Sequence, residues 1–278
     1  MKGVKISIIT INYNDAKGLE RTLVSIANQT CLDFEYIVID GGSSDDSLAI
    51  IEKYKKHIHY YISENDLGIY NAMNKGVKIA NGHYLLFLNS GDYLHDDFAI
   101  QYLYNGIEGG EDLICFNQQI LGDGISYLCQ PPLVIRFSDL YFGYLPHAST
   151  CIKKELFEKV GLYDENLKIV SDWKFMILSL FIYKCSYKKH EKTISTFILG
   201  GISSQIDNSK ERMSVINEYF SEYVSDYKEL ENNRKLLGTN RVKMLFEIEK
   251  TTIGKKIISI FFRGYLHLFG NKKLKDIL

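Results

Sequence analysis

Four acidic side chains follow apolar runs in the first third of the chain: Asp40, Glu64, Asp66 and Asp92. If these runs are parallel strands, their carboxyl ends meet at one edge of a sheet, where such sheets bind ligands. Carboxylates gathered there repel one another unless a cation lies between them. Magnesium or manganese, which prefer oxygen ligands, would fit this site and could carry a phosphorylated ligand.

A simpler interpretation of the same residues stays open. Asn, Ser, Gly and Asp are ordinary turn formers, so "NSGD" at residues 89–92 and its counterparts could be solvated turns. The sequence has no GxxxxGK[ST], and "NYND" at residues 12–15 stands where GxGxxG would follow a first strand. Phosphate charge must then be balanced by a metal or by side chains. Lys75 is one candidate, and a solvated helix lysine is the alternative.

The elements that would position these residues alternate between strand and helix. The predicted strands span 4–11, 34–40, 57–63 and 83–89, and the predicted helices begin after Asp15 and span 47–56 and 69–80. This alternation is typical of parallel βαβ units. Farther along, the expected strands are 112–118, 149–154 and 196–201, with helices near 154–161 and 171–181. We therefore predict an α/β fold with a mixed, mostly parallel sheet flanked by helices, followed from residue 208 by a helical tail.

Composition narrows the function classes. The chain is 46% hydrophobic, which supports a core, and its net charge of -1 gives no reason to expect nucleic acid as a partner. Its five cysteines form no CxxC pair, so we expect buried thiols in a reducing cytoplasm. The N-terminus begins with a strand-like run, so no signal peptide is expected. No apolar run reaches the roughly 18 residues that a membrane span needs.

Five motifs in order resemble the family 2 inverting nucleotide-sugar glycosyltransferases, and within them the bacterial enzymes of O-antigen and capsule synthesis. The resemblance covers roughly residues 4–204. The motifs are "SIITINYN", "YIVIDGGSSDDS", "SENDLGIYNAMNKGVKIANGHYLLFLNSGD", "PHASTCIKKELFEKVGLYDE" and "VSDWKF". The resemblance implies the GT-A fold and transfer of a sugar from a nucleotide-sugar donor. It also implies a catalytic domain of residues 1–207, with a nucleotide-binding half (1–95) and an acceptor half (96–207), and an extension over 208–278.

The resemblance assigns roles to individual positions. Asp92 matches the last acid of the family's DxD motif, which implies a ligand for Mn²⁺ or Mg²⁺. Asp172 matches the catalytic base, and His147 lies in the stretch that lines the acceptor. The positions expected to bind the nucleotide sugar are Thr10, Asn12, Tyr13, Asp40, Asp66, Lys75, Ser90 and Gly91.

Two departures from the family pattern matter. Asn89 and Gly91 replace the other acids of the DxD motif, which leaves Asp92 as its only carboxylate. One carboxylate is adequate for magnesium held mostly by phosphates and water. Gly41 replaces the second acid of the "DDgS" pattern, an acid that can contact the base in relatives. UDP is the preferred nucleotide, although the lost acid bears on the choice of base.

Inverting transfer is a single displacement, in which the attacking hydroxyl must lose a proton to a base within hydrogen-bond reach. Asp172 is the candidate, and its alternative role is an acid at a helix N-terminus. Trp173, the only tryptophan, could stack on an acceptor sugar or pack in the core. Two other classes remain open: a sugar nucleotidyltransferase, and a sugar- or nucleotide-binding module or scaffold without activity.

Basic residues gather at the end of the chain. From Arg241 to Leu278 there are nine basic and three acidic residues, a net charge of +6, whereas the other 240 residues carry -7. The tail also contains "IISIFFRGYLHLFG", in which apolar and aromatic residues stand among lysines. This pattern predicts an interfacial helix on the inner face of the cytoplasmic membrane, consistent with a lipid-linked saccharide acceptor. The alternative is packing on the catalytic domain or on a second copy in a homodimer.

Overall fold

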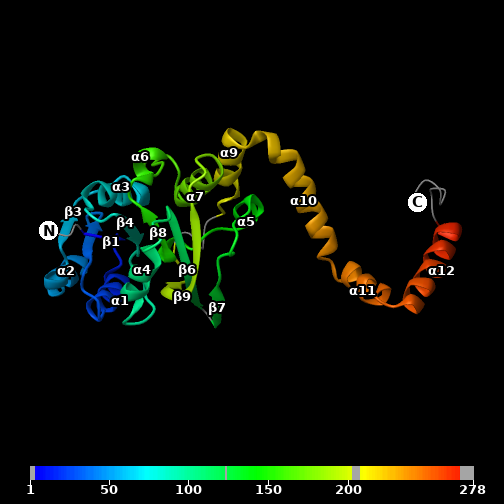
Figure 1. Cartoon of the computed structure of the whole chain (residues 1–278), viewed down its shortest axis with the longest axis horizontal. Helices are drawn as coiled ribbons and strands as arrows, with labels where there is room; N and C mark the ends of the chain where they lie inside the picture. Colours follow the sequence, from blue (N-terminus) through cyan, green and yellow to red (C-terminus); the bar gives the residue numbers. More distant parts are fainter. Residues whose placement is uncertain (1–3, 123, 202–206, 270–278) are drawn as a thin grey trace. The chain divides into compact units, whose positions relative to one another are not determined.

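Strands and helices alternate through the first half of the chain, as the hydrophobic pattern predicts (Figure 1). The computed structural model describes residues 4–122, 124–201 and 207–269. The first elements are β1 (Ile6–Asn12), α1 (Ala16–Ala27), β2 (Glu35–Asp40), α2 (Ser47–Lys53), the 3-10 turn η1 (Lys55–His57), β3 (Tyr60–Ser63), α3 (Ile69–Ile79) and β4 (Tyr84–Phe87). The strand expected from residue 57 begins later, because η1 occupies its first residue.

These four strands are parallel, which confirms the predicted βαβ arrangement. β1 lies between β2 and β4, and β2 also pairs with β3. The register aligns Asn12 with Asp40, and Asp40 with Ser63. The polar residues that end these strands therefore meet at one edge of the sheet.

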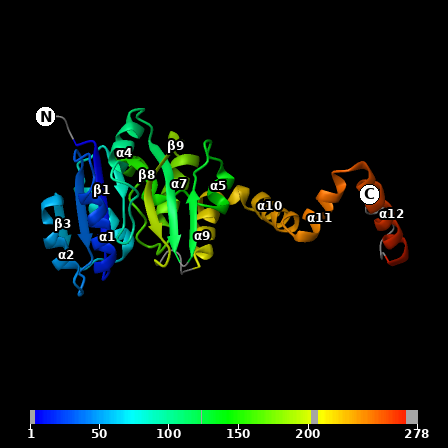
Figure 2. The ribbon, with the colours of Figure 1, turned by 90° about the horizontal axis from the view of Figure 1, so that it is seen from below.

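The second half makes the sheet mixed, as expected. Its elements are β5 (Tyr93–Leu94), α4 (Ala99–Ile107), β6 (Leu113–Gly122), β7 (Ile125–Cys129), α5 (Phe137–Phe142), η2 (His147–Ser149), β8 (Thr150–Lys153), α6 (Leu156–Lys159), α7 (Ser171–Phe181) and β9 (Tyr187–Ile198). The strand order is β3-β2-β1-β4-β8-β6-β9-β5, with β7 beside β6. Figure 2 shows the sheet from below, with β3, β1 and β8 in this order.

The two faces of the sheet follow the two-residue period of its strands. On one face, Ile6 and Ile8 of β1 pack with Leu19 and Leu23 of α1, and α4 extends the same cluster. On the other face α3 approaches β1 closely, since a Cβ at Gly76 would lie 2.5 Å from Ile9. Figure 1 accordingly shows α1 and α4 on one side of the sheet and α3, α6 and α7 on the other.

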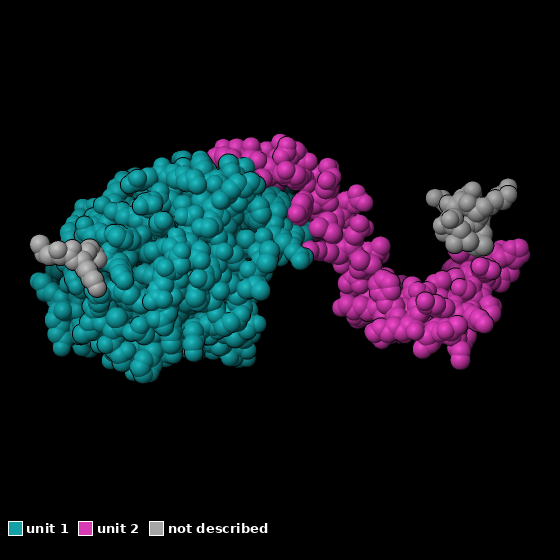
Figure 3. Space-filling view, in the orientation of Figure 1, with its two compact units in different colours: residues 1–215 teal, residues 216–278 magenta. Residues whose placement is uncertain are grey.

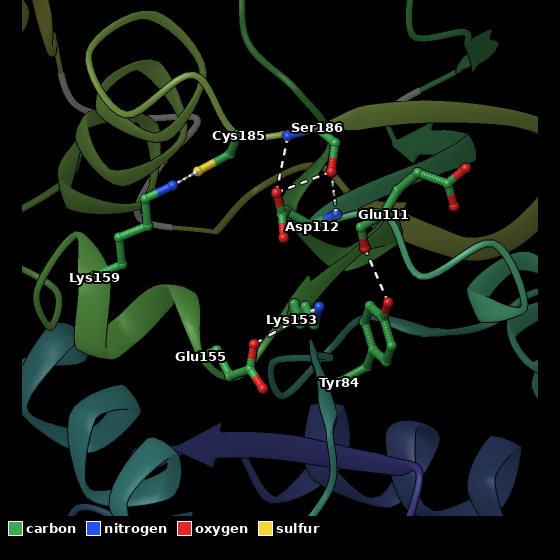
Figure 4. Close-up of polar contacts among 8 residues, drawn as sticks. All are labelled: Tyr84, Glu111, Asp112, Lys153, Glu155, Lys159, Cys185 and Ser186. Atoms are coloured by element: carbon green, nitrogen blue, oxygen red, sulfur yellow. Dashed lines mark hydrogen bonds and ion pairs between the residues drawn. The ribbon is translucent and has the colours of Figure 1, made fainter.

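Polar contacts connect the starts of β4, β6 and β9 (Figure 4). Asp112, just before β6, accepts hydrogen bonds from the backbone and hydroxyl of Ser186, each 2.9 Å, just before β9. The Tyr84 hydroxyl of β4 donates to the carbonyl of Glu111 at 2.9 Å. These contacts align β4, β6 and β9 and leave their opposite ends to form the site.

The chain divides into two compact units, residues 1–215 and 216–278 (Figure 3). Helix α9 (Ser209–Tyr219) spans the division, and η3 (Ser221–Tyr223), α10 (Val224–Leu237), α11 (Asn240–Glu249) and α12 (Thr252–Phe269) follow it. Within the described residues the segment after 207 is helical and contains no strand, as predicted. The assignment of residues 1–207 and 208–278 as functional domains stays a prediction. None of the described helices is both long and apolar enough to cross a membrane.

Candidate active site

The ends of β1 and β2 are joined through the carboxylate of Asp40. It accepts hydrogen bonds from Asn12 at 2.7 Å, from the Ser43 hydroxyl at 2.6 Å and from the Ser63 hydroxyl at 2.6 Å. Burial alone would raise the pKa of Asp40, but these hydrogen bonds outweigh burial and hold the pKa below its usual value. The charged carboxylate of Asp40 therefore holds together the segments that follow β1, β2 and β3. Direct contact between Asp40 and a nucleotide stays a prediction.

Two side chains predicted to bind the nucleotide, those of Tyr13 and Asp66, come together at Gly41. A Cβ at Gly41 would lie 2.4 Å from Oδ2 of Asp66 and 3.3 Å from the ring of Tyr13. Oδ1 of Asp66 accepts a hydrogen bond of 2.9 Å from the backbone of Gly68, while Tyr13 is 66% exposed. The carboxylate of Asp66 thus occupies the space that a side chain at position 41 would need.

The four acids do not gather around one cation. Glu64 forms an ion pair of 2.8 Å with Lys75, which also donates to the carbonyl of Asn65 at 3.3 Å. Over residues 4–122, 124–201 and 207–269, no group of three or more His, Cys, Asp or Glu residues could hold a metal ion. The expectation of a four-carboxylate site is therefore wrong, because Asp40, Glu64 and Asp66 are already bonded to neighbouring side chains or backbone amides. The charge of Lys75, in α3, is paired with the loop that precedes this helix.

The "NSGD" loop is held by helix α1. The hydroxyl of Thr22 donates to the carbonyl of Asp92 at 2.6 Å and accepts from the amide of Gly91 at 3.2 Å. Arg21 donates to the carbonyl of Gly91, and Ser90 donates to Asp15. Gly91 has φ +97°, a conformation that favours glycine, so the acid missing from this position would strain the backbone.

Asp92 is a buried acid with few partners. Only 7% of the residue is exposed, and Oδ1 accepts one long hydrogen bond, 3.4 Å, from the amide of Ile198. Burial raises the pKa of Asp92 to about 8, although the amide of Ile198 and the charge of Arg21 act in the opposite direction. Oδ1 of Asn89, in the same loop, is buried without a hydrogen-bond partner among the described residues. One carboxylate and one unused amide oxygen fit a magnesium or manganese ion whose other ligands are phosphate and water.

Thr10 lies inside the sheet instead of facing the loops. Its hydroxyl donates to the carbonyl of Leu88 at 2.7 Å and accepts from Tyr36 at 2.9 Å, and the residue is fully buried. In this arrangement Thr10 supports the strand that carries Asn12 and Tyr13. Its direct contact with a nucleotide stays a prediction without support from this geometry.

Asp172 lies in the first turn of α7. The hydroxyl of Tyr70, in α3, donates a hydrogen bond of 2.9 Å to Oδ1 of Asp172. No described residue donates to Oδ2, and Asp172 is only partly buried. Among the described residues, the carboxylate therefore has one oxygen bound by Tyr70 and one oxygen without a donor.

His147 lies in the same neighbourhood and acts electrostatically on Asp172. Its Nε2 is 2.9 Å from the hydroxyl of Tyr163, and its ring stacks on Phe87 at a centroid distance of 5.0 Å. Burial lowers the pKa of His147, against the charge of Asp172, so a neutral imidazole is favoured at neutral pH. The Nε2 atom of His147 is bonded to Tyr163. The other ring nitrogen of a neutral His147 could form one hydrogen bond with a saccharide hydroxyl.

The geometry around Trp173 favours the core-packing alternative. Only 6% of the residue is exposed, and its indole donates to the carbonyl of Leu140 at 2.9 Å. Arg212, from α9, lies 4.4 Å from the ring centroid and donates to the carbonyls of Leu140 and Gly143. The guanidinium of Arg212 therefore already lies against the ring of Trp173. Stacking of Trp173 on a sugar stays a prediction.

Sequence reasoning missed Tyr70, Tyr163 and Arg212. Tyr70 and Tyr163 stand within quoted motifs, "GIYNAMNKG" and "GLYDE", so an aromatic residue in a recurrent motif was an available signal. Arg212 lies beyond the last motif, in a polar helix, and nothing in the sequence around it indicates its contact with Trp173.

Comparison with known proteins places this site in a family context. Residues 7–136 match the family model described as Glycosyl transferase family 2. An uncharacterised glycosyltransferase of Mycobacterium tuberculosis is 30% identical over 185 residues, which cover 64% of this chain and 69% of that protein. The poly(ribitol-phosphate) beta-N-acetylglucosaminyltransferase TarP of Staphylococcus aureus is 36% identical over 128 residues, which cover 44% of this chain and 39% of that protein.

Two solved structures share the fold. TarS of S. aureus, residues 1–349, in complex with UDP-GlcNAc, matches with a TM-score of 0.63 and 20% identity, covering 77% of this chain and 64% of that one. A mannosyltransferase from Pyrobaculum calidifontis, in complex with GDP-Man and Mn²⁺, matches with a TM-score of 0.56 and 13% identity, covering 73% and 59%. The predicted GT-A fold is confirmed by the first of these.

Proposed function

This chain belongs to glycosyl transferase family 2 and is a glycosyltransferase, and from that premise we propose that it moves a hexosyl or N-acetylhexosaminyl group from a UDP-sugar to a saccharide hydroxyl with inversion. The family expected from the five motifs is confirmed. The observation that carries the finer proposal is the carboxylate of Asp172, which has one oxygen bound by Tyr70 and the other without a hydrogen-bond donor among the described residues.

The donor is proposed to lie over the ends of β1 and β2. Tyr13 offers an exposed ring that can stack on a base, and Asp66 presents Oδ2 beside it at Gly41. A carboxylate accepts hydrogen bonds from N–H groups such as the imide of uracil. The position of Asp66 beside Tyr13 therefore supports UDP as the nucleotide of the donor. Asn12 and Ser43 hold the loop against Asp40, so they keep this surface in place.

The diphosphate is proposed to lie at the "NSGD" loop. Asp92 and the amide oxygen of Asn89 would hold Mg²⁺ or Mn²⁺, which supplies charge to stabilise the leaving diphosphate. Arg21 and Thr22 fix the backbone of Gly91 and Asp92 and so orient these oxygens. Burial raises the pKa of Asp92 to about 8, and the residue would hold such an ion in its ionised form.

The reaction is a single displacement at the anomeric carbon. Oδ2 of Asp172 accepts the proton of the attacking hydroxyl while the new oxygen–carbon bond forms and the carbon–phosphate oxygen bond breaks. The bonding electrons leave with the nucleoside diphosphate. Attack from the side opposite the leaving group inverts the configuration, so one carboxylate is sufficient.

Replacing Asp172 by Asn tests this proposal. The substitution keeps the size and removes the base, so we expect donor binding to stay near the wild-type level and turnover to fall by about 100-fold or more. The measurement is steady-state transfer together with donor binding by calorimetry. Asp226→Asn, which also removes an acid from the first turn of a helix, is the control and should leave both unchanged. If Asp172→Asn abolishes donor affinity while turnover survives, Asp172 binds donor and the base lies elsewhere.

We further propose that the acceptor is a lipid-linked saccharide of surface polysaccharide, such as O-antigen or capsule, and that α12 attaches the enzyme to an anionic membrane. Exposed apolar residues of α12 recur at helical spacing: Ile253, Ile257, Ile260, Phe261 and Leu268. At 100° per residue Lys255 lies opposite these residues, whereas Lys256 and Arg263 flank them on one side. Phe262, which is also exposed, lies on the side of Lys255. A helix with exposed apolar residues gathered toward one side and basic residues beside them is typical of a membrane interface.

A further inference from the structure

The hydrogen bond between Tyr70 and Asp172 joins residues 102 positions apart in the chain. It links α3, which follows the loop of residues 64–68, to α7, whose first turn contains Asp172. Tyr70 is 5% exposed, so its hydroxyl has no alternative partner in bulk water. A buried hydroxyl without its acceptor would lose a hydrogen bond, which favours the observed pairing.

Tyr70 is a donor at every pH at which a cytoplasmic enzyme works. Burial is the largest cause that raises the pKa of Tyr70 far above the usual value, and the charge of Asp172 raises it further. The phenol therefore keeps its proton and gives it to Oδ1 in a hydrogen bond without transferring it. A hydrogen bond to an ionised carboxylate is among the stronger kinds.

Helix α3 is itself fixed, so Tyr70 cannot drift from its partner. Asn74 donates to the carbonyl of Tyr163 at 2.9 Å and to Glu165 at 2.7 Å, and it accepts from the amide of Tyr163 at 3.0 Å. Asn71 donates to Glu165 at 2.8 Å. The rings of Tyr70 and Tyr163 also contact each other, with centroids 5.8 Å apart. One helix therefore sets both the phenol that reaches Asp172 and the tyrosine that holds His147.

We propose that Tyr70 is a positioning residue that fixes the rotamer of Asp172 and thereby selects Oδ2 as the oxygen that accepts the proton of the attacking hydroxyl. This inference rests on the proposed role of Asp172 as the base. With Oδ1 engaged, the carboxylate presents a single free oxygen in one orientation, and the approach of the acceptor hydroxyl is restricted to that side. Orientation of this kind contributes to rate by reducing the entropy lost in reaching the reactive geometry.

Other charged and titratable groups face Asp172 from the elements packed around it. They are His147 of η2, Tyr163 of the segment before α7, and Arg212 of α9, each of which interacts with the charge of Asp172. His147 and Tyr163 bond to each other, and Arg212 donates to backbone carbonyls of residues 140–143. Tyr70 alone among these described groups donates directly to the carboxylate.

Tyr70→Phe removes the hydroxyl and keeps the ring. We expect kcat to fall by about 10-fold to 100-fold, the factor that a hydrogen bond to a charged group is worth, with unchanged affinity for the donor. Tyr84→Phe is the matched control, since it deletes a buried phenol whose partner is the carbonyl of Glu111, away from the site (Figure 4).

A double substitution separates positioning from a general structural effect. If Tyr70 acts through Asp172, Tyr70→Phe causes no further loss of turnover in the Asp172→Asn background. An equal loss in both backgrounds would overturn the inference, as would a loss of activity confined to donor KM. A thermal unfolding measurement checks that each variant is folded. If Asp172→Asn alone keeps full turnover, the proposed base fails first, which distinguishes that outcome from failure of the role of Tyr70.

Discussion

Asp92 and Asp40 are buried acids whose surroundings act on their charge in opposite directions. Burial raises the pKa of Asp92 to about 8, whereas hydrogen bonds hold the pKa of Asp40 below its usual value. Between about pH 3.8 and pH 8 the folded protein therefore binds more protons at Asp92 than the unfolded chain does. The free energy of unfolding falls as pH rises across that window. For Asp40 the sign is opposite, and the stabilisation is present above the unfolded pKa and is lost as pH falls.

These two acids lead to opposite predictions for the stability of the protein in the absence of metal. At pH 8, Asp92→Asn should raise the Tm by about 3 °C or more, since about 1 kcal/mol shifts a domain of this size by that amount. Asp40→Asn should lower the Tm, because a carboxylate that accepts four hydrogen bonds is lost. Transfer activity should disappear in Asp92→Asn despite its higher stability. Calorimetry at pH 5 and pH 8 measures both effects, and a Tm of Asp92→Asn below wild type at pH 8 would contradict the burial argument.

Gly41 gives a second prediction at the residue scale. A Cβ there would lie 2.4 Å from Oδ2 of Asp66, the end of a side chain that can rotate away. Gly41→Ala should therefore change stability little but displace Asp66 and weaken UDP binding by about 10-fold, the loss expected for one hydrogen bond to a charged group. Titration calorimetry with UDP makes the measurement. Gly264→Ala, where a Cβ meets nothing within 4 Å, is the control.

The same position allows a stricter test. Combining Gly41→Asp with Asp66→Ala moves the carboxylate across the gap without adding charge, so part of the lost UDP affinity should return. Gly41→Asp alone places two carboxylates in one space and should bind more weakly than either. If Asp66→Ala binds UDP as well as wild type, Asp66 does not read the nucleotide.

At the scale of elements, the sequence predicts the strands whose residues are buried. β1, β2 and β4 are buried along their whole length, so their apolar runs were visible, and Asp92 and Asp172 stand in motifs at the ends of elements. β7 was missed because its residues are largely exposed, and β5 because it has only two residues. The first half of β9, "YKKHEKT", was missed because it is polar and is held by backbone pairing with β6, which any side chain permits.

The contacts that complete the site could not be predicted from the sequence, for a different reason. The bond from Tyr70 to Asp172 spans 102 residues, and that from Ile198 to Asp92 spans 106. Such pairs are set by the order of strands in the sheet, and a hydrophobic pattern carries no information about which distant strands become neighbours. The four-carboxylate hypothesis failed for the related reason that local partners, such as Lys75 for Glu64, cannot be seen in spacing alone.

At the scale of the whole molecule, charge is divided unevenly along the chain. Residues 241–278 carry +6 and the remainder -7. Each basic residue near an anionic leaflet contributes about 1 kcal/mol, so the tail has enough charge for reversible binding. We expect the full chain to sediment with vesicles containing anionic lipid at low salt and to be released in part at high salt.

A matched pair of substitutions separates insertion from simple charge attraction. Phe261→Asp and Ser259→Asp each add one negative charge to α12, but only Phe261 belongs to the exposed apolar face. Phe261→Asp should reduce vesicle binding more than Ser259→Asp. Equal losses would mean that charge alone attaches the tail, and a full chain that stays in the supernatant with anionic vesicles at low salt would remove the membrane from the proposal.

The position of β9 in the sheet has a consequence for how the enzyme is made. β5 pairs only with β9 among the described strands, and the amide of Ile198 reaches Asp92. A nascent chain can assemble β1 to β4 early, but the loop that carries Asp92 stays incomplete at least until residue 198 has been synthesised. At roughly 5–20 residues per second, that takes about 10–40 s. During translation the growing polypeptide therefore lacks a finished donor site, and it consumes no sugar nucleotide before nearly three quarters of the chain has been synthesised.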